Sequence, residues 1–158
     1  MFREMRRKFK EITQEAAVAL LCHERRGVLA VNGDDGYPYA VPINYLFDET
    51  SGKIYFHGSR VGHKADAIKA CDKVCFTVYG NMRIKDEAWA PYLQSVVVFG
   101  HCRLLIEPEE AAEACRKFAM KYYPSQELVE EVLAADGKAV QMFEITVEHL
   151  SGKEIQER

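Results

Sequence analysis

The chain has 158 residues, of which 48% are hydrophobic and 28% charged, a composition typical of an ordinary soluble protein with a sizeable core. The net charge of -3 gives no general attraction to nucleic acid, and no apolar run is long enough to span a bilayer. The basic start MFREMRRKFK lacks the apolar stretch of a signal peptide, so we expect a cytoplasmic protein that binds neither membrane nor nucleic acid.

Cysteine usage argues against a disulfide framework and against a metal site. The five cysteines, an odd number, have no CxxC spacing, and most lie in apolar segments, which predicts reduced and buried thiols. Cys71 and Cys75, taken with His57 and His63, do not have the spacing of a structural zinc site. We therefore expect no bound metal.

The N-terminal region is predicted to form an arm and a helix. Residues 1–10 are basic, and we expect this arm to fold over its own domain or over a partner subunit rather than to bind a membrane or nucleic acid. Thr13 begins a helical pattern that continues to about His23, and residues 24–26 form a polar connection. The side chains expected to face inward are Ala17, Leu20 and Leu21.

A β-hairpin follows, and its second strand contains a proline. The Asp-Asp-Gly turn at 34–36 tolerates positive φ and joins a strand over 27–32 to a long strand over 37–47. Pro42 cannot donate to a ladder, so the second strand must form an edge, a bulge or a barrel corner there. Neighbouring backbone groups would then be free for a ligand, with Asn44 as a nearby polar side chain. A purely structural role for Pro42 is the alternative.

Residues 53–80 are predicted to form a strand, a short helix and a second strand. The strand over 53–57 alternates as a half-buried strand should, and Gly58 and Ser59 break it, with Ser59 as the expected cap of the helix. The apolar positions expected to face inward are Val61, Ala65 and Ile68 on the helix and Val74, Phe76 and Val78 on the following strand.

Cations gather in the first turn of this short helix. Arg60, His63 and Lys64 lie there, whereas the first acid is Asp66. Because a helix N-terminus carries partial positive charge and free N–H groups, these cations are mildly unfavourable alone and suit a bound anion, most simply a phosphate. The alternative is a solvated turn whose cations point into water. The local sequence leaves both interpretations open.

The C-terminal half is predicted to contain a long loop, a central strand and two helices. Residues 81–93, which include the only tryptophan, Trp89, show no period and should either cover a site or pack at a subunit contact. A long central strand is expected over 94–106, with a bend at Gly100. The remaining elements are helices over 108–122 and 125–135, a last strand over 140–147 and a polar tail.

Together these elements predict a mainly β, α+β fold: an antiparallel or mixed barrel with peripheral helices, in a single domain over 1–158. No nucleophile motif occurs. His57 lies at a strand end and would face the anion site, whereas Glu144 is expected to face solvent or an interface without a second acid. A ligand site without acid–base machinery suits a protein whose cofactor supplies the reactivity.

The pyridoxamine 5′-phosphate oxidase-related flavoproteins resemble this chain in four segments, which follow in the same order: DDGYPYAVPINYLFD, KIYFHGSRVGHKADAIK, KVCFTVY and YLQSVVVFGHCRLL. The Nim-type, nitroimidazole-resistance-like branch also resembles the opening FREMRRK and the ending VEHLSGKE. The resemblance thus covers nearly the whole chain. It implies an FMN-binding split β-barrel that forms a homodimer, with FMN at the subunit interface.

The resemblance also implies which residues hold the cofactor. It assigns these residues to cofactor binding and gives none of them a catalytic role. The residues implied are Pro42, Ile43, Asn44 and Tyr45 along the isoalloxazine ring; His57, Gly58, Ser59 and Lys64 at the phosphate and ribityl end, with Arg60 and His63 as helpers; and Ser95 and Val96 from the strand across the interface.

The function implied by the resemblance is that of an FMN-dependent oxidoreductase, a reductase of small electron-poor aromatic compounds such as nitroimidazoles. The tail EHLSGKEIQER lacks the arginine–histidine constellation with which the oxidases recognise pyridoxal phosphate, which argues against pyridoxamine phosphate oxidase activity. The alternative is a non-catalytic flavin- or haem-binding protein, since relatives bind haem or a deazaflavin instead of FMN.

Overall fold

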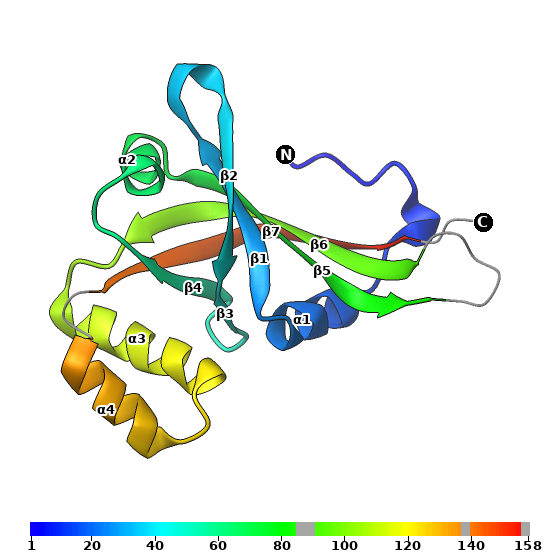
Figure 1. Cartoon of the computed structure of the whole chain (residues 1–158). Helices are drawn as coiled ribbons and strands as arrows, with labels where there is room; N and C mark the ends of the chain where they lie inside the picture. The colour runs from blue at the N-terminus through cyan, green and yellow to red at the C-terminus, as the bar shows by residue number, and fades with distance from the viewer. Residues whose placement is uncertain (85–90, 137–139, 156–158) are drawn as a thin grey trace.

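One curled antiparallel sheet holds the chain together (Figure 1). The computed structural model describes residues 1–84, 91–136 and 140–155. Its strands, in the order β2-β1-β5-β6-β7-β4-β3 across the sheet, are β1 (Arg26–Asn32), β2 (Pro38–Asn44), β3 (Leu46–Asp48), β4 (Lys53–Gly58), β5 (Lys73–Arg83), β6 (Tyr92–Leu104) and β7 (Gln141–Ile155). The helices are α1 (Gln14–His23), α2 (His63–Ala70), α3 (Pro108–Tyr122) and α4 (Gln126–Asp136), with single 3-10 turns at Lys8–Lys10 and Asp34–Gly36.

Strands β2 and β3 are consecutive in the chain but lie at opposite edges of the sheet. Tyr45, the one residue between them, is fully buried, and its hydroxyl donates to Leu21 O at 2.7 Å. Its backbone N–H donates to the Tyr122 hydroxyl at 2.9 Å. The continuous strand predicted over 37–47 is therefore wrong at Tyr45, where the chain crosses from one edge to the other.

The crossing makes the sheet curl until β2 contacts β4 near the opposite edge. The result is a split β-barrel with helices at its periphery, as predicted, and all strand pairs in the described residues are antiparallel. Pro42 lies on β2, an edge strand, which is one of the three positions that the sequence allowed for it.

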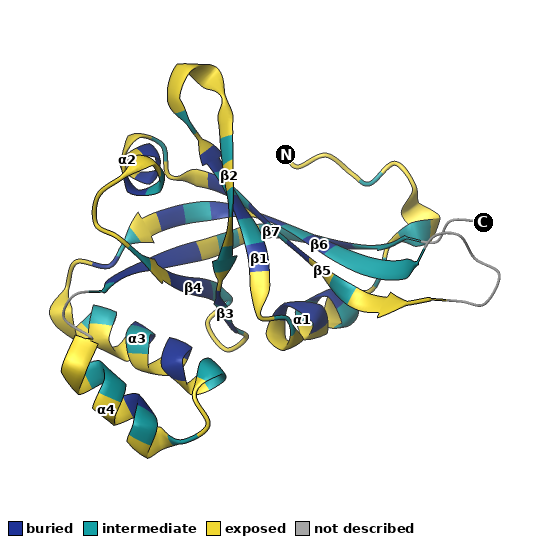
Figure 2. Ribbon diagram, viewed as in Figure 1, coloured by how far each residue is buried: buried dark blue, intermediate teal, exposed yellow. Residues whose placement is uncertain are grey.

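Aromatic and aliphatic side chains fill the interior of the barrel. Figure 2 shows buried positions along the strands and on the helices that pack against them. Phe56 and Phe143 stack with ring centroids 4.8 Å apart, and Tyr45 meets Phe76 edge-on at 4.8 Å. Helix α1 packs against the barrel and begins at Thr13, whose side chain accepts a hydrogen bond from Ala16 N, as predicted. The inward residues predicted on α1 and β5 are all buried: Ala17, Leu20, Leu21, Val74, Phe76 and Val78.

Helix α3 packs against β4 and β7 on the outer face of the sheet, and α4 packs against α3 (Figure 1). A second apolar cluster lies beneath α3 and consists of Tyr55, Leu105, Ala114, Phe118 and Met142. Ile54 and Phe56 face the interior as predicted, but Tyr55 on the opposite face is buried as well. The prediction of a half-buried β4 is thus wrong, because its alternation did not reveal the helix that covers the second face.

The turn between β4 and α2 also differs from the prediction. Gly62, with a φ of 107°, precedes the helix, which begins at His63. Ser59 does not cap the helix; its Oγ accepts from Val61 N at 3.3 Å. Val61 is 74% exposed rather than inward, whereas Ala65 and Ile68 are buried as predicted. Glycine adopts such a φ readily, and residues 60–62 form a bend before the helix starts.

The long strands extend further than the sequence predicts. Strand β5 continues to Arg83 and β6 begins at Tyr92, so the two ends of the loop predicted over 81–93 are strand. Trp89, with its predicted lid or contact role, lies outside the described residues. A polar tail was expected from Ser151 onward. Strand β7 instead continues to Ile155, because its second half pairs with β6. The register shifts beside Gly100, as the predicted bend requires.

The N-terminal arm folds back over its own sheet, one of the two placements expected. The Phe2 ring stacks on His149, with centroids 4.6 Å apart, and on Phe99 at 5.6 Å. Glu11 forms an isolated bridge with Lys153 on β7. Within the described ranges, no helix is long and apolar enough to cross a membrane.

All five cysteines are free thiols, but their burial differs from the prediction. Cys102 alone is buried, Cys22 is exposed, and the other three are half-buried. Helix α1 ends close to Cys22, which lies on its outward side rather than among the apolar residues beneath. Across the part of the chain that the structure describes, no group of three or more potential metal-ligating side chains occurs.

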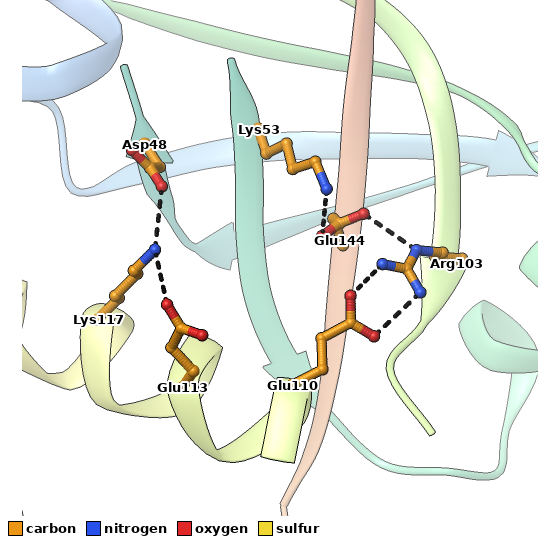
Figure 3. A network of polar contacts seen from close by, with 7 residues as sticks. All are labelled: Asp48, Lys53, Arg103, Glu110, Glu113, Lys117 and Glu144. Atoms are coloured by element: carbon orange, nitrogen blue, oxygen red, sulfur yellow. Dashed lines mark hydrogen bonds and ion pairs between the residues drawn. The ribbon is translucent and has the colours of Figure 1, made fainter. Parts of the chain in front are cut away.

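Glu144 is the one buried carboxylate of the sheet, and the expectation that it faces solvent or an interface is wrong (Figure 3). It is 2% exposed, and its two oxygens accept from Lys53 Nζ and Arg103 Nε, each at 3.0 Å. Arg103 also pairs with Glu110 at the start of α3. The network joins β4, β6 and β7 to α3 and holds the Arg103 guanidinium in its charged form, with its pKa raised by the two carboxylates.

We expect Arg103→Met to lower the free energy of unfolding by about 1–3 kcal/mol, because it leaves the Glu144 carboxylate buried with one partner instead of two. Urea unfolding measures the loss. The matched control is Arg116→Met, which removes an exposed pair with Glu130 and should cost less than about 0.5 kcal/mol. Equal losses in the two variants would contradict a structural role for the Glu144 network.

Candidate functional site

A groove of about 440 Å³ lies where the curled sheet brings β2 close to β4 and α2. Its lining residues come from segments that are far apart in the sequence, and the crossing at Tyr45 is what brings them together. Five of the six are predicted site residues, and Arg26 is the exception. The lining residues are Arg26, Pro42, Ile43, Asn44, His57 and Lys64.

Lys64 is the most unusual of these residues electrostatically. Its Nζ lies 5.3 Å from the ring centroid of Phe56 and 5.6 Å from that of Phe143, close to where the barrel interior begins. Gly58 permits this position, since a Cβ there would lie 2.8 Å from Nζ. Among the described residues no carboxylate pairs with Lys64, and burial lowers the pKa of its ammonium. A half-buried cation without a counter-ion is suited to an anionic ligand.

His57 lies beside Lys64 at the end of β4. Its ring meets Phe118 edge-on, with centroids 5.0 Å apart. Partial burial lowers the pKa of His57, and the neighbouring Lys64 cation lowers it further. The imidazole is therefore neutral at neutral pH, with one nitrogen to donate and one to accept a hydrogen bond.

Arg26 is a lining residue that the sequence analysis missed, because residues 24–26 were taken as a polar connection. It is the first residue of β1 and lies opposite Asn44 of β2 in the strand register. Its Nε donates to Asn44 Oδ1 at 3.3 Å. The signal that could have found it is the hairpin register, since counting back from the turn at 34–36 pairs Arg26 with Asn44.

The edge position of β2 adds backbone groups to the groove. Strand β2 pairs with β1 on one side only, so its other side has no strand partner. Pro42 contributes a carbonyl but no N–H there. This edge combines apolar surface from Pro42 and Ile43 with the amide of Asn44, which suits a flat ligand that carries polar atoms on its rim.

Several predicted site residues do not line the groove. Tyr45 is buried in the crossing described above, and His63 stacks on Tyr39 of the hairpin, with centroids 4.0 Å apart. Ser59 lies in the exposed turn before α2. Arg60, from the same turn, lines a different cavity beside α3 and α4. Of the side chains expected at the phosphate end, Lys64 and His57 are thus brought together, whereas Arg60 and His63 lie elsewhere.

Ser95 and Val96 lie on a distant part of the same sheet. Ser95 pairs with Lys153 of β7, whereas Gly58 at the groove pairs with Gln141. The twelve positions between Gln141 and Lys153 correspond to roughly 40 Å of extended strand. Val96 is fully buried within its own barrel. Within one chain, therefore, these two residues and the groove do not meet.

Comparison with known proteins agrees with this fold. The sequence matches the pyridoxamine 5′-phosphate oxidase family over residues 13–154, and the chain belongs to that family, which confirms the predicted resemblance. No curated protein matches the chain.

Solved structures of similar fold cover nearly all of the chain at low sequence identity. A candidate 5-nitroimidazole antibiotic resistance protein from Bacteroides thetaiotaomicron has a TM-score of 0.74 and 18% identity, over 91% of this chain and 86% of its own. The flavocytochrome Anf3 from Azotobacter vinelandii has a TM-score of 0.78 and 22% identity, over 98% and 73%. A FAD-binding protein from Mesorhizobium loti has a TM-score of 0.65 and 20% identity, over 93% and 98%.

We expect Lys64→Met to raise the pKa of His57, because it removes the neighbouring positive charge that disfavours the imidazolium. NMR titration of the His57 Cε1 resonance measures the change. His101, whose pKa is raised mainly by its hydrogen bond to Asp72, is an internal control and should not move. An unchanged His57 pKa in this variant would show that the two side chains are not electrostatically coupled.

Proposed function

We propose that the protein is a cytoplasmic, FMN-binding oxidoreductase that reduces small electron-poor aromatic compounds, nitroimidazoles among them. The observation that carries this proposal is the half-buried Lys64 ammonium, which has no counter-ion among the described residues and lies in a groove with an apolar wall. A phosphate-bearing, flat cofactor fits that combination of charge and surface. Family membership and neighbours described as flavin-binding support it.

In this proposal Lys64 and His57 hold the phosphate and ribityl end of the flavin, and Gly58 and Ser59 contribute backbone and hydroxyl donors. Pro42 and Ile43 lie along the ring system, with Asn44 oriented by Arg26. Flavin, when bound, supplies the two-electron chemistry. No carboxylate is among the residues that line the groove, so the protein's part is to position the ligand and to offset its negative charge.

A homodimer completes this site in our proposal. Ser95 and Val96 are distant from the groove of their own chain, so they would contribute only from a partner subunit. Next to Ser95 in the register, Tyr79 of β5 is 67% exposed, and farther along that strand Met82 is 64% exposed. Two large side chains that are this exposed on one strand support a contact surface there.

The nitroimidazole part of the proposal is supported by the neighbour whose description names resistance to 5-nitroimidazole antibiotics. The groove is lined by the apolar Pro42 and Ile43 and by the cations Arg26 and Lys64, which is compatible with a flat aromatic ligand that carries a polar nitro group. The tail EHLSGKEIQER does not match the arginine–histidine constellation of the pyridoxamine phosphate oxidases, which favours a nitro compound over pyridoxamine phosphate.

We expect Lys64→Glu to abolish retention of FMN, because it replaces the cation at the phosphate with an anion. The absorbance spectrum of the purified protein, taken after adding FMN and removing the excess, measures the bound flavin. Lys73→Glu makes the same charge change at an exposed position of β5 and should retain as much FMN as the wild-type protein. Equal flavin content in the two variants would overturn the assignment of Lys64 to the phosphate.

Turnover distinguishes an enzyme from a carrier. With NADH or NADPH as the reductant and a 5-nitroimidazole as the acceptor, we expect the flavin-loaded protein to oxidise the reduced nucleotide faster than the same concentration of free FMN. A rate equal to that of free FMN, with flavin still bound, would favour the non-catalytic carrier. A haem-like absorbance band in place of a flavin spectrum would remove the flavin mechanism.

We expect Met82→Asp to weaken the dimer and to lower FMN retention together, because the charge would be buried at the proposed contact. Sedimentation velocity gives the oligomeric state, and flavin absorbance gives the retention. Met120→Asp, at an exposed methionine of α3, serves as the control and should change neither. A monomeric variant that retains FMN in full would show that one chain is enough for the site.

A further inference from the structure

A second cavity, separate from the groove, lies beside α3 and α4 at the ends of β6 and β7. Its volume is about 630 Å³, within the range of roughly 300–1,000 Å³ that small-molecule sites usually have. Apolar side chains form most of its wall: Leu105, Ile106, Ala111, Leu133, Val140 and Met142. The cavity and the groove are separate, since no residue lines both.

Gln141 supplies a hydrogen-bond acceptor to this cavity. The residue is 6% exposed, and its Nε2 donates to the carbonyl oxygens of Leu105 at 2.9 Å and Met142 at 2.7 Å. Because both partners are acceptors, the amide nitrogen must face them and Oε1 must face away. No described residue donates a hydrogen bond to Oε1, and no buried side-chain oxygen among the described residues lacks a partner, so Oε1 is not sealed from solvent. Gln141 lines the cavity, so a ligand bound there lies next to this amide.

Arg60 supplies a cation at the rim of the same cavity. Its backbone carbonyl accepts from Lys69 Nζ at 3.2 Å, which fixes the turn, but its guanidinium makes no ion pair within the described part of the chain. The other charged lining residues, Arg116 and Glu130, already neutralise each other, with Nε and Oε1 2.8 Å apart. Arg60 is thus the one uncompensated charge around an apolar cavity with an internal acceptor.

We propose that this cavity binds a small aromatic carboxylate that also carries an N–H donor. The ring occupies the apolar wall, the N–H donates to Gln141 Oε1, and the carboxylate pairs with Arg60. A purely apolar molecule would leave Oε1 without a donor, and a dianion would exceed the single free charge at the rim. The site is distinct from the flavin groove and does not depend on flavin binding.

The test uses indole-3-acetate, which has all three features, and isothermal titration calorimetry on the purified protein. We expect saturable binding at one site per chain. Indole lacks the carboxylate and 1-methylindole-3-acetate lacks the N–H, and each should bind about three- to tenfold more weakly. Arg60→Gln should weaken indole-3-acetate to a similar degree without affecting indole, whereas Arg83→Gln, an exposed control with the same change of charge, should affect neither.

Cys115 reports the location, since it lines the cavity, and exposed Cys22 is its control. Indole-3-acetate should slow alkylation of Cys115 by iodoacetamide and leave that of Cys22 unchanged, as read by mass spectrometry. Saturating FMN should alter neither the affinity nor the protection, so a failed flavin assignment would not affect this result. Absence of saturable binding up to roughly 10 mM, binding that does not protect Cys115, or competition by FMN would each overturn the proposal.

Discussion

The burial of Tyr45 is the constraint on which the rest of the structure depends. Strands β2 and β3 lie at opposite edges of the sheet with only this residue between them, so the sheet must curl for the chain to be continuous. Hydrogen bonds from Tyr45 to Leu21 and to the Tyr122 hydroxyl connect the crossing to α1 and α3. Burial of its phenol raises the pKa of Tyr45 far above neutrality, so the hydroxyl remains a donor under all physiological conditions.

The candidate site is a consequence of this curl rather than of any local motif. Arg26, Asn44 and Lys64 come from the start of β1, the end of β2 and the start of α2, and only a curled sheet places them around one groove. Lys64 reaches the rings of Phe56 and Phe143 because Gly58 leaves its path free. The barrel interior thereby lowers the dielectric around the Lys64 ammonium, the half-buried cation of the groove.

Much of this architecture could be predicted from the sequence because its signals are local. The cap at Thr13, the turn at 34–36 and the bend at Gly100 each depend on near neighbours, and the structure confirms all three. The errors arise where distant parts of the chain decide. The polar tail becomes strand because β6 is there to pair with it, and Arg60 lines the α3–α4 cavity because elements distant in the sequence pack beside its bend.

Lys64 and Glu144 differ in how their charges are compensated. The buried carboxylate of Glu144 has two cationic partners, and even the exposed Arg116 has a carboxylate. Lys64, although half-buried, has none among the described residues, which costs folding free energy in the absence of ligand. A bound anion would offset that cost in the folded state alone, so ligand binding and stability should be linked through this one side chain.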